Sequence, residues 1–174
     1  PEFLDPKTGG LKTFDYVVAN PPFSVKSWTN GVNTGSDPFK RFEYGVPPEK
    51  NGDYAFLLHI LASLKSTGKG AVILPHGVLF RGSSEGAIRQ HLIENDMLEA
   101  VIGLAPNLFY GTTIPACLLF FRATKDKARK KHVLFVDGSK RFTKGKNQNE
   151  LSISDVEDIF SVYESNGNTE KNDI

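Results

Sequence analysis

Residues 14–24, FDYVVANPPFS, join an apolar segment to groups that can bind a flat amine. The side-chain oxygen of Asn20 and the carbonyl of Pro21 are two hydrogen-bond acceptors, and the Pro21-Pro22 pair holds them stiffly side by side. Two such acceptors match the two N–H bonds of a primary amino group. The ring of Phe23 can stack on a planar body that carries this group. The pattern indicates a site for an NH2 on a planar ring.

An amine on such a ring is a poor nucleophile because its lone pair is delocalised into the ring. Hydrogen bonds from both of its N–H groups pull the nitrogen toward tetrahedral geometry and free the lone pair for alkylation. The alkylated amine is cationic and loses its proton readily, so positioning and local electrostatics suffice. A bare Asn-Pro-Pro would indicate only a turn that ends a strand. The apolar strand before Asn20 and the aromatic residue after Pro22 favour the functional interpretation.

The elements that must position this motif follow an α/β pattern. Short apolar segments predict strands, in order, at 14–19, 71–75, 98–102, 116–122 and 132–138. Helices are predicted at 54–66, with Asp53 as N-cap, at 83–95, and at 154–164 after a Ser154/Glu157 capping box.

These strands should form one mixed sheet flanked by helices. We expect the first three to be parallel, the strand at 116–122 to be antiparallel, and the strand at 14–19 to lie at an edge. The strand at 132–138 should lie between 71–75 and 116–122, or outside them. In open α/β sheets ligands bind at the carboxyl ends of parallel strands, where Asn20 falls.

The composition is that of an ordinary globular domain. The chain has 174 residues, 39% hydrophobic and 24% charged, with a net charge of +1. Its single cysteine excludes an internal disulfide framework and suits the reducing cytoplasm. No apolar segment is long enough to span a bilayer. Because the chain starts at Pro1 and its only methionine is Met97, we expect it to be a piece of a longer protein.

The segment from Asn20 to Phe23 resembles the Asn-Pro-Pro-aromatic signature of S-adenosylmethionine-dependent methyltransferases that act on amino groups. Other segments resemble the modification subunit of type I restriction-modification systems: RFEYGVPPEKNGDYAFLLHIL, VILPHGVLFRGSSEGAIRQHLIEND, EAVIGLAPNLFYGTTIPACLLFFR and GKNQNELS. The resemblance covers residues 14–163. It implies the carboxyl-side half of a Rossmann-like S-adenosylmethionine-dependent methyltransferase fold, and methylation of adenine N6 in DNA with the target base flipped out.

The resemblance also implies roles for single residues. Asn20 and the Pro21 carbonyl would hold the adenine amino group, Pro22 would fix the turn, and Phe23 would stack on the flipped ring. Asn20 and Pro21 would line part of the site for the donor, S-adenosylmethionine. The Gly-rich loop that holds the donor in such enzymes is not found before Asn20.

From this we expect a partial catalytic domain over residues 1–150. Residues 151–174 would form a C-terminal helix and a tail that leads to a missing helical region. We expect the 174-residue piece alone to be inactive.

The implied enzyme is a site-specific, adenine-specific DNA methyltransferase in the cytoplasm. Its implied partners are DNA and the specificity and restriction subunits of the same system. Asn-Pro-Pro-aromatic alone also permits methylation of guanine N2 in RNA or of a protein glutamine amide. A non-catalytic module for subunit interaction is a further interpretation, and these alternatives stay open.

Basic residues are concentrated in one part of the chain. Residues 122–146 hold ten Lys or Arg against two Asp, a net charge of +8. This segment could contact DNA phosphates through Lys125, Lys127, Arg129, Lys130 and Lys131. A solvated hairpin tip is the competing interpretation.

Three further features carry expectations. The long loop at 24–52 contains four aromatic residues, which either touch DNA and the base or pack against the sheet. No histidine shares a metal-ligand spacing with another histidine or with Cys117, so we predict no metal site. His76 is expected to be a hydrogen-bonded structural residue, and Cys117 a small buried thiol.

Overall fold

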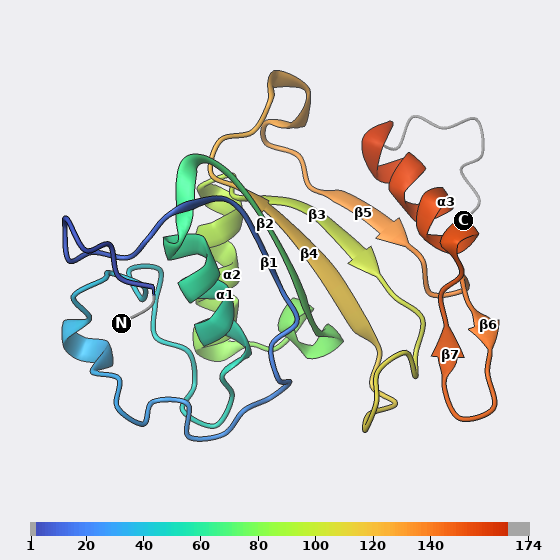
Figure 1. Cartoon of the computed structure of the whole chain (residues 1–174), viewed down its shortest axis with the longest axis horizontal. Helices are drawn as coiled ribbons and strands as arrows, with labels where there is room; N and C mark the ends of the chain where they lie inside the picture. Colours follow the sequence, from blue (N-terminus) through green and yellow to red (C-terminus); the bar gives the residue numbers. More distant parts are fainter. Residues whose placement is uncertain (1–2, 167–174) are drawn as a thin grey trace.

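The apolar segment before Asn20 forms the edge strand of a mixed sheet (Figure 1). The structure is a computed structural model, and it describes residues 3–166. Within these residues the sheet has five strands in the order β1-β2-β4-β3-β5. Their bounds are β1 (Phe14–Ala19), β2 (Leu64–Pro75), β3 (Leu98–Gly103), β4 (Ala116–Arg122) and β5 (Leu134–Asp137).

The strand directions confirm the predicted α/β architecture. β1 pairs with β2 in parallel, and β4 is antiparallel to both β2 and β3. β5 pairs in parallel with β3, so it takes the outside position of the two that the sequence left open. The four parallel strands give the sheet a carboxyl end, where Asn20 follows β1, and an amino end, where β4 finishes.

Helices cover both faces of the sheet. α1 (Asp53–Ala62) and α2 (Ser83–Glu94) lie on one face, where Leu57 and Ile88 pack with Leu74 and Phe121 in the main core (Figure 1). α3 (Ile153–Glu164) lies on the opposite face, where Ile159 packs with strand residues in a second cluster. The residues of α3 therefore complete the packing of the sheet. The division at residue 150 into two parts stays a prediction.

The face that α3 covers is open over β1. Tyr16 and Val18 of β1 are 72% and 81% exposed, and Phe160 of α3 is 51% exposed. Only β2 pairs with β1 among residues 3–166, so β1 is an edge strand as predicted.

Two element boundaries differ from the predictions. α1 ends at Ala62, and β2 begins at Leu64, well before the predicted residue 71. The pairing register of β1 and β2 jumps from Leu64 to Lys69, so the residues between them bulge outward. Gly68 suits this bulge, because a Cβ there would lie 3.0 Å from the Phe14 carbonyl oxygen. The predicted helix ran past the true helix end because Ser63 to Ser66 contain no Gly or Pro to mark the boundary.

The capping box of α3 lies two residues earlier than predicted. Ser152 is the N-cap, and its hydroxyl accepts from the backbone N–H of Asp155, whose carboxylate accepts in return from the Ser152 N–H. The predicted pair Ser154/Glu157 is wrong because an equally good Ser-x-x-acid pattern sits just upstream.

The connections contain short elements. These are the 3-10 helices η1 (Thr34–Ser36), η2 (His76–Leu79) and η3 (Lys127–Arg129), and a hairpin of β6 (Thr143–Lys144) and β7 (Asn149–Glu150). In the long loop, Phe42 and Tyr44 pack against the main core, and the Trp28 indole donates to the Pro48 carbonyl. The packing interpretation of this loop is confirmed for Phe42 and Tyr44. Within residues 3–166, no helix is long and apolar enough to cross a membrane.

Candidate active site

The Asn-Pro-Pro-Phe turn borders an open cavity of about 760 Å³ at the carboxyl end of the sheet. Asn20 and Pro22 are exposed, and Pro21 and Phe23 are half-buried. Pro75, at the end of β2, and the loop between β3 and β4 supply the other walls. The structure thus places the four predicted residues together on one wall of a cavity that is open to solvent.

The β3–β4 loop, residues 104–115, supports the aromatic member of the motif. The ring of Phe109 meets the ring of Phe23 edge to face, with centroids 5.7 Å apart. A bridge between Phe109 and Thr112 and a positive φ of 76° at Gly111 turn the loop tightly at this point. The edge-to-face contact restrains the Phe23 ring and leaves the cavity beside it open.

Asp53 binds the backbone directly after the Asn-Pro-Pro-Phe motif. The sequence predicts it as the N-cap of α1, but it is the first helical residue, and Gly52 is the N-cap. Its buried carboxylate instead accepts a hydrogen bond of 2.7 Å from the backbone N–H of Ser24. Ser24 has a positive φ of 53°, a conformation that costs energy for a residue with a side chain. The Asp53 bond stabilises this conformation one residue after Phe23.

Arg81 neutralises the buried acids at this end of the sheet. Its guanidinium lies 2.6 Å from the Asp53 carboxylate and also pairs with buried Glu85 of α2. Burial acts to lower the pKa of Arg81, but hydrogen bonds to Glu85 and Asp53 outweigh burial and raise this pKa. A Cβ at Gly77 would lie 2.3 Å from the guanidinium, so a larger residue there would displace the Arg81 side chain. Asp53, Arg81 and Glu85 are called the turn cluster below.

The predicted nucleic-acid residues lie at the opposite end of the sheet. β4 runs toward the amino end, so the residues after Arg122 begin there. Lys125 is buried, and its ammonium bonds to Asp96 at 2.6 Å and to the His132 carbonyl at 2.8 Å. This burial corrects the prediction for Lys125, since a phosphate cannot reach it.

Arg129 is engaged as well. It donates to Glu99 at 3.0 Å and to the Tyr163 carbonyl at 2.7 Å. Lys127, Lys130 and Lys131 are exposed, and for these three a phosphate contact stays a prediction.

Cys117 and His76, the other residues considered from the sequence, both have buried side-chain atoms. Cys117 is fully buried in β4, as predicted, and burial raises the pKa of its thiol to about 12. His76 was expected to be hydrogen-bonded, but its Nε2 is buried without a hydrogen-bond partner among residues 3–166. Within the same range, no group of three or more His, Cys, Asp or Glu side chains is placed to hold a metal ion.

The site can therefore position a planar amine without acid–base catalysis by a side chain. Two oxygen acceptors and a restrained aromatic ring border open space, and the charged groups nearby are paired beneath the turn. Asn20 and Phe23 were found from the sequence. The roles of Asp53 and Phe109 were missed, because their partners are 29 and 86 residues away in the chain.

Comparisons with known proteins agree with this arrangement. The family model described as N-6 DNA Methylase matches residues 2–173. The MjaIX methylase subunit of a type I restriction enzyme from Methanocaldococcus jannaschii is 34% identical over 166 residues, which are 91% of this chain and 30% of that protein. The HindI methylase subunit of a type I restriction enzyme from Haemophilus influenzae is 39% identical over 127 residues, which are 72% of this chain and 28% of that protein.

A solved structure is similar over nearly the same part of the chain. The methyltransferase subunit of a type I restriction-modification system from Streptococcus thermophilus superposes with a TM-score of 0.80 and 40% identity. The match covers 88% of this chain and 32% of that one. The chain spans about 30% of the length of the relatives that it matches.

Proposed function

Because the chain belongs to the N-6 DNA methylase family, we propose that it forms part of a site-specific DNA methyltransferase that acts on adenine N6 in a type I restriction-modification system. The observation that supports this most strongly is the Asn-Pro-Pro-Phe turn beside an open cavity at the carboxyl end of a parallel strand. The relatives named above are methylase subunits of type I restriction enzymes, which supports the choice of DNA adenine over other amines.

In this proposal the chain binds the amine of an extruded adenine. The Asn20 side-chain oxygen and the Pro21 carbonyl accept its two N–H bonds, and the Phe23 ring stacks on the base. Extrusion costs a few kcal/mol of stacking and pairing. Stacking on an aromatic side chain returns about 1–3 kcal/mol. The two acceptors localise the lone pair on N6, and water takes the surplus proton after transfer.

S-adenosylmethionine, when bound, supplies the electrophilic methyl group. The open cavity fits this assignment, since Asn20 and Pro21 form one wall and leave space beside the bound amine. The role of the chain is to aim the nitrogen lone pair at that space. The Asp53–Ser24 bond serves this role, because movement of Ser24 would move the Phe23 ring and the Pro21 carbonyl with it.

The proposed partners are DNA, a specificity subunit and a restriction subunit, since the relatives belong to type I restriction enzymes. A DNA substrate and a single buried cysteine favour a cytoplasmic location. The inactivity of the 174-residue piece alone stays a prediction.

The test is the chemical identity of the methylated product. The full-length protein is incubated with isotopically labelled S-adenosylmethionine and, in separate reactions, with DNA, RNA or protein. The digested nucleosides or amino acids are then identified by mass spectrometry. We expect label in N6-methyladenine. Label in methylguanine of RNA or in methylglutamine of protein would replace DNA adenine by one of the other amines. No label in any of the three would leave the chain as a non-catalytic module and contradict the proposal.

A further inference from the structure

The basic residues that are clustered in the sequence fall at two opposite ends of the sheet. Six of them, from Arg122 to Lys131, lie at the amino end. The other four are Lys140, Arg141, Lys144 and Lys146, and they follow β5, whose parallel direction brings the chain to the carboxyl end. The β6–β7 hairpin therefore lies at the same end of the sheet as the loops that border the cavity (Figure 1).

The two groups of basic residues also differ in their ion pairs and in their distance from the cavity. At the amino end, Arg122, Lys125 and Arg129 form ion pairs with carboxylates. Lys127, Lys130 and Lys131 are exposed there, far from the cavity. At the carboxyl end Arg141 pairs with Asp158, whereas Lys144 and Lys146 are exposed on the hairpin and form no ion pair within the described part of the chain. The charge that can meet a phosphate near the active site is thus on the hairpin.

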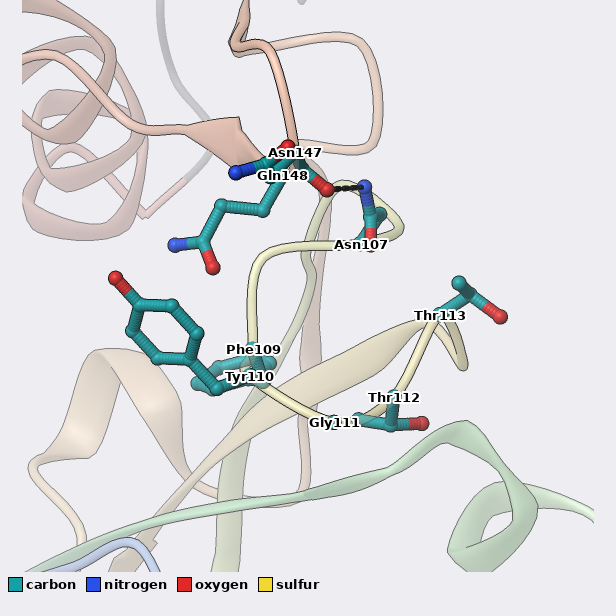
Figure 2. A pocket seen from close by; sticks show the side chains of 8 residues that line it. All are labelled: Asn107, Phe109, Tyr110, Gly111, Thr112, Thr113, Asn147 and Gln148. Atoms are coloured by element: carbon teal, nitrogen blue, oxygen red, sulfur yellow. Dashed lines mark hydrogen bonds between the residues drawn. The ribbon is translucent and has the colours of Figure 1, made fainter.

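A second pocket, of about 510 Å³, lies between the β3–β4 loop and the β6–β7 hairpin. Its lining is rich in amide, hydroxyl and aromatic side chains: Asn107, Phe109, Tyr110, Thr112, Asn147 and Gln148. Figure 2 shows the Tyr110 ring and the Gln148 amide directed toward each other from the two elements. Tyr110 is 90% exposed, which is unusual for an aromatic ring without a partner.

Hydrogen bonds fix the hairpin against the loop. The backbone N–H of Asn149 donates to the Asn107 carbonyl at 2.8 Å, and its side-chain amide donates to the Pro106 carbonyl at 2.8 Å. The Asn107 amide donates to the Asn147 carbonyl at 3.3 Å (Figure 2). The pocket is therefore built from two elements held in a defined register.

This pocket lies next to the cavity of the candidate active site. Residues 109–112 line both, so the two spaces lie on either side of one loop. A nucleotide strand that places one base beside Asn20 has to pass close to this loop with its neighbouring nucleotides.

We propose that this second pocket and the hairpin bind the DNA strand that flanks the extruded adenine, an inference that rests on the proposed function. Tyr110 offers a stacking surface to a neighbouring base, since every base has a face that stacks on an aromatic ring. The amides of Asn147 and Gln148 can bond to base edges or sugar–phosphate oxygens. Lys144 and Lys146 contact phosphates and neutralise them.

The experiment measures DNA affinity against salt concentration for two double variants of the full-length protein in its complex. Lys144→Ala with Lys146→Ala removes two charges from the hairpin, and Lys127→Ala with Lys130→Ala removes two from the amino end. The probe is a DNA duplex that the wild-type complex methylates. The plot of log K against log salt has a negative slope, and each lost phosphate contact reduces the magnitude of this slope by about 0.9. We expect a decrease of about 2 for the hairpin variant and a smaller decrease for the other.

A second measurement tests the pocket without changing charge. Gln148→Ala and Tyr110→Ala should each raise the Kd for the same duplex, by about 10-fold for Tyr110. A wild-type slope and Kd in all hairpin and pocket variants would overturn the inference, as would weakened subunit assembly with unchanged DNA affinity. Failure of the proposed function is a different result, because the wild type itself would then not methylate DNA.

Discussion

The two ends of the sheet each hold a buried cluster of acids and arginines, and the two clusters restrain different things. At the carboxyl end the turn cluster (Asp53, Arg81 and Glu85) binds a backbone N–H of the loop that carries the motif. At the amino end Glu99 pairs with Arg122 and Arg129 and accepts the hydroxyl of Tyr163. Glu99, Arg122, Arg129 and Tyr163 are called the anchor cluster below.

The anchor cluster attaches α3 to the sheet. The Tyr163 ring stacks on Phe120 of β4 with centroids 4.6 Å apart, and the Arg129 guanidinium lies 4.5 Å from the centroid of the Tyr163 ring. Burial and the Glu99 carboxylate both raise the pKa of the Tyr163 hydroxyl, which therefore stays a hydrogen-bond donor. Similar ion pairs thus position the turn of the candidate site at one end and join α3 to the sheet at the other. The surroundings of an ion pair, and not its chemistry, determine its role.

The largest effect is expected at the motif itself. In the full-length protein, Asn20→Ala removes one of the two acceptors for the amine and should lower kcat by about 100-fold or more, as loss of one preorganised hydrogen bond does elsewhere. Affinity for the donor should stay roughly intact. The measurement is single-turnover transfer of a labelled methyl group, with donor binding followed by calorimetry. Near-normal methylation would rule out the proposed role of Asn20.

A matched pair of variants separates the two clusters. Asp53→Asn and Glu99→Gln each remove one buried carboxylate charge and its ion pairs, while Arg81 keeps Glu85 and Arg122 keeps Asp126. Each should therefore lower the free energy of unfolding by at most about 3–5 kcal/mol. Only Asp53→Asn should lower kcat, by about 10-fold, because Ser24 and the turn would shift. Chemical unfolding and methyl-transfer rates, both measured below the melting transitions, test this. Equal losses of kcat in the two variants would abolish the distinction drawn here.

A smaller effect is expected from the ring that follows the turn. Phe23→Ala should raise the Kd for DNA by about 10-fold, since stacking is worth about 1–3 kcal/mol per base. Phe23→Tyr and Phe23→Trp keep a stacking face and should bind DNA much as the wild type does. Fluorescence of 2-aminopurine at the target position reports extrusion of the base. Equal extrusion by Phe23→Ala and the wild type would remove stacking from the proposal.

The smallest effect concerns acid stability at the amino end. Burial acts to raise the pKa of Asp96, but bonds from the Lys125 ammonium and the Lys131 backbone outweigh it and lower this pKa. A lowered folded-state pKa contributes stability above the unfolded value near 3.8, and this contribution is lost as the pH falls through the folded-state pKa. Asp96→Asn should therefore flatten the decline in unfolding free energy below pH 4. Asn tolerates the positive φ of 57° at this position.

Much of the fold was predictable because its signals are local. The existence and directions of β1 to β4 were predictable from the apolar segments and the α/β pattern, although β2 begins at Leu64, before the predicted residue 71. The Asn-Pro-Pro-Phe turn indicated the site. The position of β5 was not predictable, since strand order depends on packing between distant segments. The Asp53–Ser24 bond also joins distant segments and was missed. An acid at a helix N-terminus has a plausible local role as N-cap, and this role was predicted instead. The basic segment was predicted as a single DNA-contacting surface. Residues close in sequence, such as Lys131 and Lys140, in fact lie at opposite ends of β5.

The edge position of β1 has a consequence for how fast its backbone exchanges hydrogen with water. Successive amides of a strand point to opposite sides, and β1 has a partner only on the side of β2 among the described residues. In deuterated buffer every second amide from Phe14 to Ala19 is therefore protected by the ladder, and those between exchange at the rate of open chain. Fast and slow hydrogen exchange should therefore alternate from one residue to the next along β1. Any segment that pairs with the open side of β1 would slow exchange of the unprotected amides, and its binding could be detected in this way.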